Sequence, residues 1–256
     1  MSFIDAIVLG VIEGVTEFLP ISSTGHLILA SDLLHLPDTE FLKTFEIAIQ
    51  LGAILAVVFL YWRLIFTKFE VVKRVLAAFL PTAILGLAFY GLVKRYLLGN
   101  EMVVLAALFL GGVFLIAFEK FYKERGDVTL EIQDLPYKKA VWIGLFQSLA
   151  LVPGVSRAAA TIVGGLILGM KRKTIVEFSF LLAIPTMAAA TGWDMLKSFD
   201  SVQAEGLGLL AIGFGMAFVT AVFSVKFLIK FIETHNFTSF GVYRILIALV
   251  FWIWVL

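Results

Sequence analysis

Two glutamates, a run of hydroxyl residues and a histidine interrupt an otherwise apolar N-terminal segment, in the sequence GVIEGVTEFLPISSTGH from Gly10 to His26. A charged side chain inside a membrane-length apolar segment costs at least ~2.5 kcal/mol, so such residues normally face a protein interior or a water-filled cavity. Glu13 and Glu17 are four residues apart, which places both carboxylates on one face of a helix. We expect the pair to share a proton, to hold a cation or to pair with a basic residue elsewhere in the bundle.

The turn that follows this acidic pair carries three consecutive hydroxyl side chains. Ser22, Ser23 and Thr24 come directly after Pro20 and Ile21, and a proline ends a helix because it lacks a backbone donor. The hydroxyls and backbone donors of such a turn can converge on an anion, or they can cap the next helix. His26, just beyond the turn, is a candidate proton donor or acceptor, and the alternative is a packed polar group.

A second polar turn, in the sequence PGVSRAAAT, contains a basic residue deep in an apolar segment. The guanidinium of Arg157 matches a phosphate or a carboxylate through two parallel hydrogen bonds. Ser156 and Thr161 supply neutral donors beside it. These residues are typical of a phosphate cradle, and the alternative is a salt bridge from Arg157 to Glu13 or Glu17 that closes the bundle.

The composition predicts an all-α membrane protein. Of 256 residues 61% are hydrophobic, which is more apolar surface than one soluble core can bury. Long apolar runs without period-two alternation favour helices over a barrel. The absence of cysteine excludes thiolate chemistry, and the net charge of +1 gives no indication of nucleic acid. Six spans are predicted, at Phe45 to Trp62, Val75 to Val93, Met102 to Phe118, Ile175 to Trp193, Leu207 to Phe227 and Phe240 to Leu256.

Two further apolar stretches, Ile4 to Leu34 and Ala140 to Met170, are each broken near the middle by a proline with serine and glycine. Each half is too short to cross a bilayer, so both stretches are predicted to be re-entrant helical hairpins.

Basic residues gather in the segments 63–74, 120–139, 171–173 and 226–230, and few lie in the alternate loops. Since Lys and Arg in short loops stay cytoplasmic, the first hairpin is predicted to enter from outside and the second from the cytoplasm.

Each hairpin is followed by three spans, so the single membrane domain, residues 1–256, is predicted to be an inverted-topology repeat. The halves cover about residues 1–119 and 137–256. EFLPISSTG in the first half matches ALVPGVSRA in the second, each with a proline three residues before a serine. Inverted repeats place polar sites near the midplane. We therefore expect the Ser22 to Thr24 turn and Arg157 to lie within a few ångströms of each other around a common cavity.

Several other polar residues lie near the ends of the predicted spans. Glu46 and Gln50 in one span and Glu177 in another follow the hairpins, where acids commonly offset the helix dipole. Tyr243 and Arg244 begin the last span on the basic side and are interpreted as an interface anchor.

The segments EGVTEFLPISSTGHL, FEIAIQLGAILAV, LVPGVSRAAATI and EFSFLLAIPTM together resemble the undecaprenyl-pyrophosphate phosphatase family, the bacitracin-resistance type of membrane phosphatase. The resemblance spans nearly the whole chain. It implies hydrolysis of a C55 isoprenoid pyrophosphate to the monophosphate, which recycles the lipid carrier of cell-wall synthesis. It further implies a multi-pass protein of the bacterial inner membrane, an active site that opens to the outer face, and help from a divalent cation, Mg²⁺ or Ca²⁺.

Carried over residue by residue, the resemblance implies three groups of site residues: catalytic Glu17, Ser23, His26 and Arg157; substrate-binding Ser22, Thr24, Ser156 and Thr161; and metal-binding Glu13 and Glu17. One departure from the commoner motif P-G-x-S-R-S-G-x-T is that Ala158 and Ala159 replace a serine and a glycine.

Two mechanisms stay open at this point. Either Ser23 attacks the phosphate with His26 or Glu17 as base, or a metal-activated water attacks directly. Besides the phosphatase, a flippase of an isoprenoid lipid phosphate and a non-catalytic scaffold are compatible with broken helices. The sequence leaves the oligomeric state open, and a homodimer is compatible with it.

Overall fold

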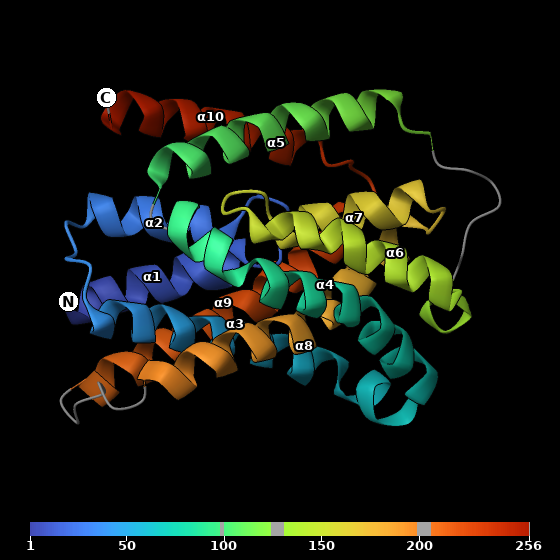
Figure 1. The fold of residues 1–256 in the computed structure, drawn as a ribbon, viewed down its shortest axis with the longest axis horizontal. Helices are drawn as coiled ribbons and strands as arrows, with labels where there is room; N and C mark the ends of the chain where they lie inside the picture. Colours follow the sequence, from blue (N-terminus) through green and yellow to red (C-terminus); the bar gives the residue numbers. More distant parts are fainter. Residues whose placement is uncertain (98–99, 124–130, 199–205, 256) are drawn as a thin grey trace.

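The computed structural model describes residues 1–97, 100–123, 131–198 and 206–255, and gives only the backbone at positions 94, 193–198, 254 and 255. Within these residues every regular element is helical (Figure 1). The α-helices are α1 Phe3–Thr16, α2 Ser23–Leu33, α3 Glu40–Thr67, α4 Phe69–Tyr96, α5 Glu101–Phe121, α6 Tyr137–Gln147, α7 Arg157–Ile167, α8 Arg172–Ser198, α9 Leu207–Phe231 and α10 Thr238–Val255. Two 3-10 turns, η1 Ile132–Asp134 and η2 Ser148–Leu151, flank α6.

Five of these helices, α3, α4, α5, α8 and α9, are long and apolar enough to cross a membrane. They contain the first five predicted spans. The sixth predicted span falls in α10, whose apolar part is shorter over the residues that the structure describes, and Leu256 lies outside them. The all-helical class is confirmed, whereas the count of six spans stays a prediction.

The two broken stretches form short paired helices in the predicted places. Helices α1 and α2 pack together at one end of the molecule, and α6 and α7 pack together at the other (Figure 1). Their turns meet in the middle (Figure 1). The helices of the hairpins have 14, 11, 11 and 11 residues, which at ~1.5 Å per residue do not cross a bilayer.

The second helices of the two hairpins, α2 and α7, have similar backbone conformations just before their first residue and just after their last. Ser22 and Ser156, the residues that precede α2 and α7, have φ values of 73° and 70°, which non-glycine residues rarely adopt. Two residues after the end of each helix comes a residue with a positive φ, His35 after α2 and Gly169 after α7. The structure therefore pairs Ser22 with Ser156, one residue away from the proline-based match, because the backbone conformation sets the correspondence.

Close helix packing holds each hairpin against a long helix. Helix α1 packs on α9, and a Cβ at Gly14 would collide with the backbone carbonyl of Ala217. Helix α6 packs on α4, and a Cβ at Gly144 would collide with the carbonyl of Ala78. Small residues that allow backbones to approach are the usual contact between helices in lipid. Helices α5 and α10 form a separate pair along one edge (Figure 1).

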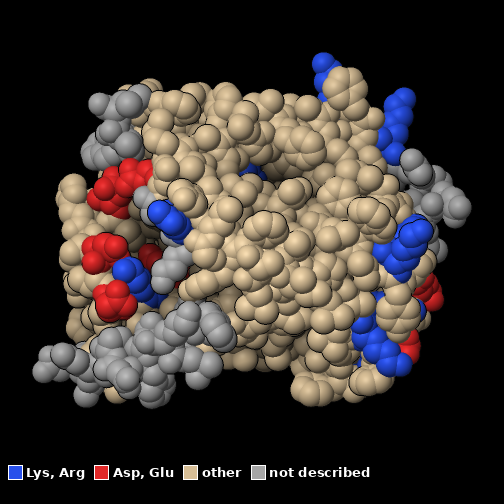
Figure 2. Space-filling model, viewed as in Figure 1, with Lys and Arg blue, Asp and Glu red and all other residues tan. Residues whose placement is uncertain are grey.

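Charged side chains gather at the two ends of the molecule (Figure 2). On the face shown, basic side chains lie mainly at one end and acidic ones mainly at the other, with a broad band of uncharged residues between them (Figure 2). This distribution fits the uneven distribution of Lys and Arg in the sequence.

Candidate active site

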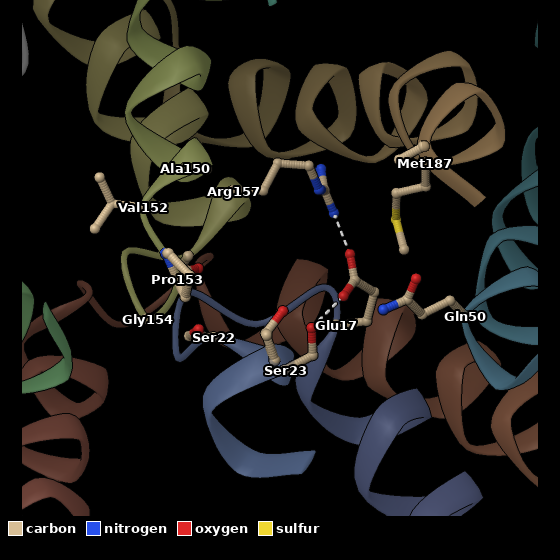
Figure 3. Close-up of a pocket in the computed structure, with 13 residues that line it drawn as sticks. Glu17, Ser22, Ser23, Gln50, Ala150, Val152, Pro153, Gly154, Arg157 and Met187 are labelled. Atoms are coloured by element: carbon tan, nitrogen blue, oxygen red, sulfur yellow. Dashed lines mark hydrogen bonds and ion pairs between the residues drawn. The ribbon is translucent and has the colours of Figure 1, made fainter. Parts of the chain in front are cut away.

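A cavity of about 230 Å³ lies where the two hairpin turns meet. Its walls come from both halves of the chain. They are lined by Glu17, Ser22, Ser23 and Thr24 of the first turn; Ala150, Val152, Pro153, Gly154, Ser156 and Arg157 of the second; Gln50 of α3; and Met187 and Ala190 of α8 (Figure 3). The predicted meeting of the Ser22 to Thr24 turn with Arg157 is confirmed.

Glu17 joins the two halves of this cavity. One carboxylate oxygen accepts a short hydrogen bond from the Ser23 hydroxyl. The other accepts from Nη2 of Arg157 at 3.2 Å (Figure 3). The salt bridge considered in the sequence is therefore present, and it forms one wall of the cavity. A hydroxyl held by a carboxylate beside a guanidinium can serve as an activated nucleophile.

Arg157 is held in place by α8 as well as by Glu17. Its Nη1 donates to the backbone carbonyl of Ser179 at 2.8 Å. Its Nε is buried and has no acceptor among the described residues. A permanently charged group in a cavity wall is suited to bind an anionic oxygen.

The two equivalent serines make different contacts. The Ser156 hydroxyl caps α7 by accepting from the backbone N–H of Ala159, whereas the Ser22 side chain makes no capping bond to α2. The helix-cap alternative considered for the first turn therefore does not hold for Ser22, and the cap at Ser156 was not predicted. Ser22 and Thr24 line the cavity with hydroxyls that can bind a substrate.

Glu13 is fully buried, and both of its carboxylate oxygens lack a hydrogen-bond donor among the described residues. It does not line the cavity, but it experiences the charges of Glu17, Glu46 and Arg157. An unpaired carboxylate of this kind fits a hard cation such as Mg²⁺ or Ca²⁺. No group of three or more His, Asp or Glu suited to a metal occurs in the described part of the chain, so protein ligands other than Glu13 and Glu17 are few.

His26 lies outside the cavity lining. Its Nδ1 is 2.8 Å from the carbonyl oxygen of Ser22, so this nitrogen carries the proton. Its Nε2 is 2.9 Å from the Tyr243 hydroxyl, and the two rings stack. Both ring nitrogens are thus occupied by neighbours that fix the turn.

Thr161 is also outside the cavity, in a buried polar cluster behind α7. Its hydroxyl donates to the backbone carbonyl of Arg157 at 2.9 Å and lies near Oε1 of Gln147. The Gln147 amide donates in turn to Thr82 of α4 and Thr186 of α8. Thr161, predicted to bind substrate, therefore does not line the cavity and instead supports the helix that carries Arg157.

The two alanines that depart from the commoner motif are both buried, and neither lines the cavity. Ala159 packs against Leu115 and Val163, and its N–H donates the capping hydrogen bond to the Ser156 hydroxyl. Helix α7 still begins at Arg157.

Two residues lie in or beside the cavity although the sequence analysis did not assign them to the site. Gln50 of α3 lines the cavity, and its polarity within an apolar helix was the available signal. Arg244 is completely buried beside the turns, so its interpretation as an interface anchor is wrong. Its charge is satisfied by backbone carbonyls, and these come from segments far away in the sequence.

The chain is similar to known proteins over nearly its whole length. The family model described as Bacitracin resistance protein BacA matches residues 6–250. A protein of Aquifex aeolicus named undecaprenyl-diphosphatase is 51% identical over 246 residues, 96% of each chain. Proteins of the same name from Sulfurihydrogenibium and Persephonella marina are 49% identical, over 254 residues (99% of this chain, 100% of the relative) and over all 256 residues of both chains. The resemblance inferred from the motifs is confirmed, and the chain belongs to the bacitracin resistance protein BacA family.

Proposed function

We propose that this protein hydrolyses undecaprenyl pyrophosphate to undecaprenyl phosphate and inorganic phosphate. The observation that carries the proposal is the chain of contacts from Ser23 through Glu17 to Arg157 across one cavity. Its relatives over the full length are named undecaprenyl-diphosphatase. The reaction recycles the lipid carrier of cell-wall synthesis at the outer face of the bacterial inner membrane.

Hydrolysis of a pyrophosphate requires compensation of the charge on the phosphate oxygens and a positioned nucleophile. Arg157 supplies permanent positive charge, and the hydroxyls of Ser22 and Thr24 supply neutral donors in the lining of the same cavity. Glu13, with Glu17, would hold a divalent cation, which when bound supplies further charge compensation for the pyrophosphate.

Ser23 is the proposed nucleophile and Glu17 its base. The Ser23 hydroxyl already donates to Glu17, so the proton passes to that carboxylate as Oγ bonds to the terminal phosphorus. The bridging P–O bond breaks, its electron pair leaves with the lipid monophosphate, and Glu17 passes its proton to that leaving group. Water then attacks the phosphoserine and gives a proton to the free Glu17 carboxylate; the P–Oγ bond breaks, Glu17 returns the proton to Ser23 Oγ, and inorganic phosphate leaves. His26 is less suited as the base, because both of its ring nitrogens are engaged outside the cavity.

The hydrocarbon part of the substrate suits the surroundings of this cavity. The face in Figure 2 is uncharged across its middle and has a hollow in which atoms of a basic side chain are visible at depth. A lipid tail remains in the bilayer when only its headgroup enters a site at the midplane.

The test is phosphate release by the purified protein in detergent, with undecaprenyl pyrophosphate and Mg²⁺ or Ca²⁺. Ser23→Ala, Glu17→Gln and Arg157→Lys are each expected to lower kcat by a factor of about 100 or more, because each removes a group that acts in the transition state. Ser224→Ala, which removes a hydroxyl that bonds to the Val15 carbonyl away from the cavity, is the matched control and should change kcat by less than about twofold.

Two outcomes would contradict the proposal: no phosphate released by the native protein, or equal activity of Ser23→Ala and Ser224→Ala. With radiolabelled terminal phosphate, acid quenching should leave label on Ser23. An unlabelled protein that still turns over would instead favour direct attack by water.

A lipid-phosphate flippase is the second candidate, favoured by the matched turns of the two hairpins. Movement of a fluorescent isoprenoid phosphate between leaflets of proteoliposomes separates the two functions. Transport that persists in the double variant Glu17→Ala, Ser23→Ala would favour the flippase.

A further inference from the structure

Arg244 of α10 belongs to neither hairpin, yet it is completely buried between them. It forms no ion pair with a carboxylate of the described residues. Instead its guanidinium donates five hydrogen bonds, all to backbone carbonyls. A buried charge is stable only when its donors are satisfied, and here the main chain satisfies them.

Three of the five acceptors lie in the two turns that form the cavity. Nη1 donates to the carbonyl of Pro20 in the first turn at 3.3 Å and to that of Val155 in the second at 3.2 Å. Nη2 donates to the carbonyl of Gly154, also in the second turn, at 2.8 Å. One planar group therefore bonds to hairpins that approach from opposite ends of the molecule. Because the donors of a guanidinium have fixed relative directions, these bonds constrain the spacing of the turns.

The other two acceptors attach Arg244 to α5. Nε donates to the carbonyl of Leu108 and Nη2 to that of Ala107. Gly111 makes room, since a Cβ there would collide with Nη2 of Arg244. The guanidinium is thus held by the α5 and α10 pair while it holds the two turns.

The neighbouring residue makes a second link to the first turn. The Tyr243 hydroxyl bonds to Nε2 of His26, whose Nδ1 donates to the carbonyl of Ser22. Ser22 and Ser156 both have positive φ, a conformation that costs of order 1–3 kcal/mol and persists only where the surroundings hold it. Arg244 bonds one or two residues before each of these serines.

We propose that Arg244 is a positioning residue for catalysis. It holds the two turns at the separation at which Ser23 and Glu17 of one turn and Arg157 of the other act on the same phosphate. This inference rests on the proposed phosphatase function. Arg244 does not line the cavity, so it acts through the backbone of the turns and not on the substrate.

The kinetic test uses Arg244→Lys in the full chain. An ammonium keeps the charge but has three donors and no planar fork, so it cannot bond to both turns and α5 together. Since misplacement of reacting groups by ~1 Å costs about 100-fold, we expect kcat to fall by about tenfold or more while KM changes by less than about threefold. Arg172→Lys is the matched control, because Arg172 is a largely buried arginine of α8 that pairs with Glu119 and lies outside both turns. It should keep the native kcat.

The structural test measures the spacing of the turns directly and needs no activity. The chain has no cysteine, so Val15→Cys near the first turn and Leu149→Cys near the second, both exposed, can carry spin labels. We expect a narrow distance distribution in the native background and a broadened or shifted one with Arg244→Lys. Gly111→Ala, which pushes on the guanidinium without removing it, should change the distance and kcat in the same direction.

The proposal is overturned if Arg244→Lys and Gly111→Ala give the same kcat and distance distribution as Arg172→Lys. If Arg244→Lys does not fold, Gly111→Ala decides alone. If the native protein releases no phosphate, the proposed function fails, and the distance measurement still decides whether Arg244 sets the spacing of the turns.

Discussion

The first residues of α2 and α7, Ser23 and Arg157, occupy equivalent positions in the two hairpins. Each directly follows a serine with positive φ, and each points into the same cavity (Figure 3). Both bond to Glu17. The same backbone conformation, present in both turns, thus directs the proposed nucleophile into the cavity from one side and a cationic group from the other. A phosphate between them would meet the attacking oxygen and the compensating charge together.

At the scale of single residues, a substitution of Glu13 tests the proposed cation site. Glu13→Gln keeps the shape of the side chain but removes the buried charge that would bind a divalent cation. We expect the Mg²⁺ concentration for half-maximal phosphate release to rise by about tenfold or more. The control is Glu177→Gln, a half-buried acid of α8 that does not line the cavity and is not among the charges that act on Glu13, which should leave the Mg²⁺ dependence unchanged. An unchanged Mg²⁺ dependence in Glu13→Gln would exclude Glu13 as a ligand.

At the scale of the elements, the hairpins are short helices held by long ones. Neither α1 nor α6 can span the bilayer, so each depends on close backbone contact with one partner, α9 or α4. The contact of α6 with α4 includes a hydrogen bond from the Thr82 hydroxyl to the Gly144 carbonyl at 2.9 Å. Packing of this kind leaves no space for a methyl group.

Gly144→Ala should therefore destabilise the protein. The added Cβ would collide with the Ala78 carbonyl and force α6 away from α4, and such overpacking costs ~1–3 kcal/mol. The thermal unfolding midpoint in detergent is expected to fall. Gly91→Ala in α4 is the control, because nothing lies within 4 Å of its added Cβ, and alanine favours a helix by up to ~1 kcal/mol. A midpoint for Gly144→Ala that matches the control would show that the contact is not tight.

The broken hairpins could be predicted from the sequence because proline, serine and glycine interrupt apolar stretches that are otherwise long enough to span. The meeting of the turns could also be predicted, because the uneven distribution of Lys and Arg indicates that the two hairpins enter the membrane from opposite sides. The correspondence of Ser22 with Ser156 could not be predicted, since it depends on φ values and not on residue types. The burial of Arg244 could not be predicted either, because its acceptors lie 89 to 224 residues away from it in the sequence.

At the scale of the whole molecule, the charge distribution defines an orientation. Basic side chains mark one end and acidic ones the other, across an uncharged band (Figure 2). From this distribution the positive-inside rule predicts that the α1 and α2 end lies outside the cell and the α6 and α7 end in the cytoplasm. A headgroup that reaches the cavity from outside would match a carrier that is recycled at the outer face.

Cysteine labelling of this cysteine-free chain tests that orientation. Asp38→Cys lies before α3 and Lys173→Cys in the first turn of α8, and both side chains are more than half exposed. A membrane-impermeant maleimide applied to intact spheroplasts is expected to modify Asp38→Cys, and to modify Lys173→Cys only after permeabilisation. Thr24→Cys, exposed and in the cavity wall, should behave like Asp38→Cys if the cavity opens outward. If only Lys173→Cys is labelled in intact spheroplasts, the topology is the reverse of the predicted one. Labelling of Thr24→Cys only after permeabilisation would keep the topology but place the opening of the cavity on the cytoplasmic side.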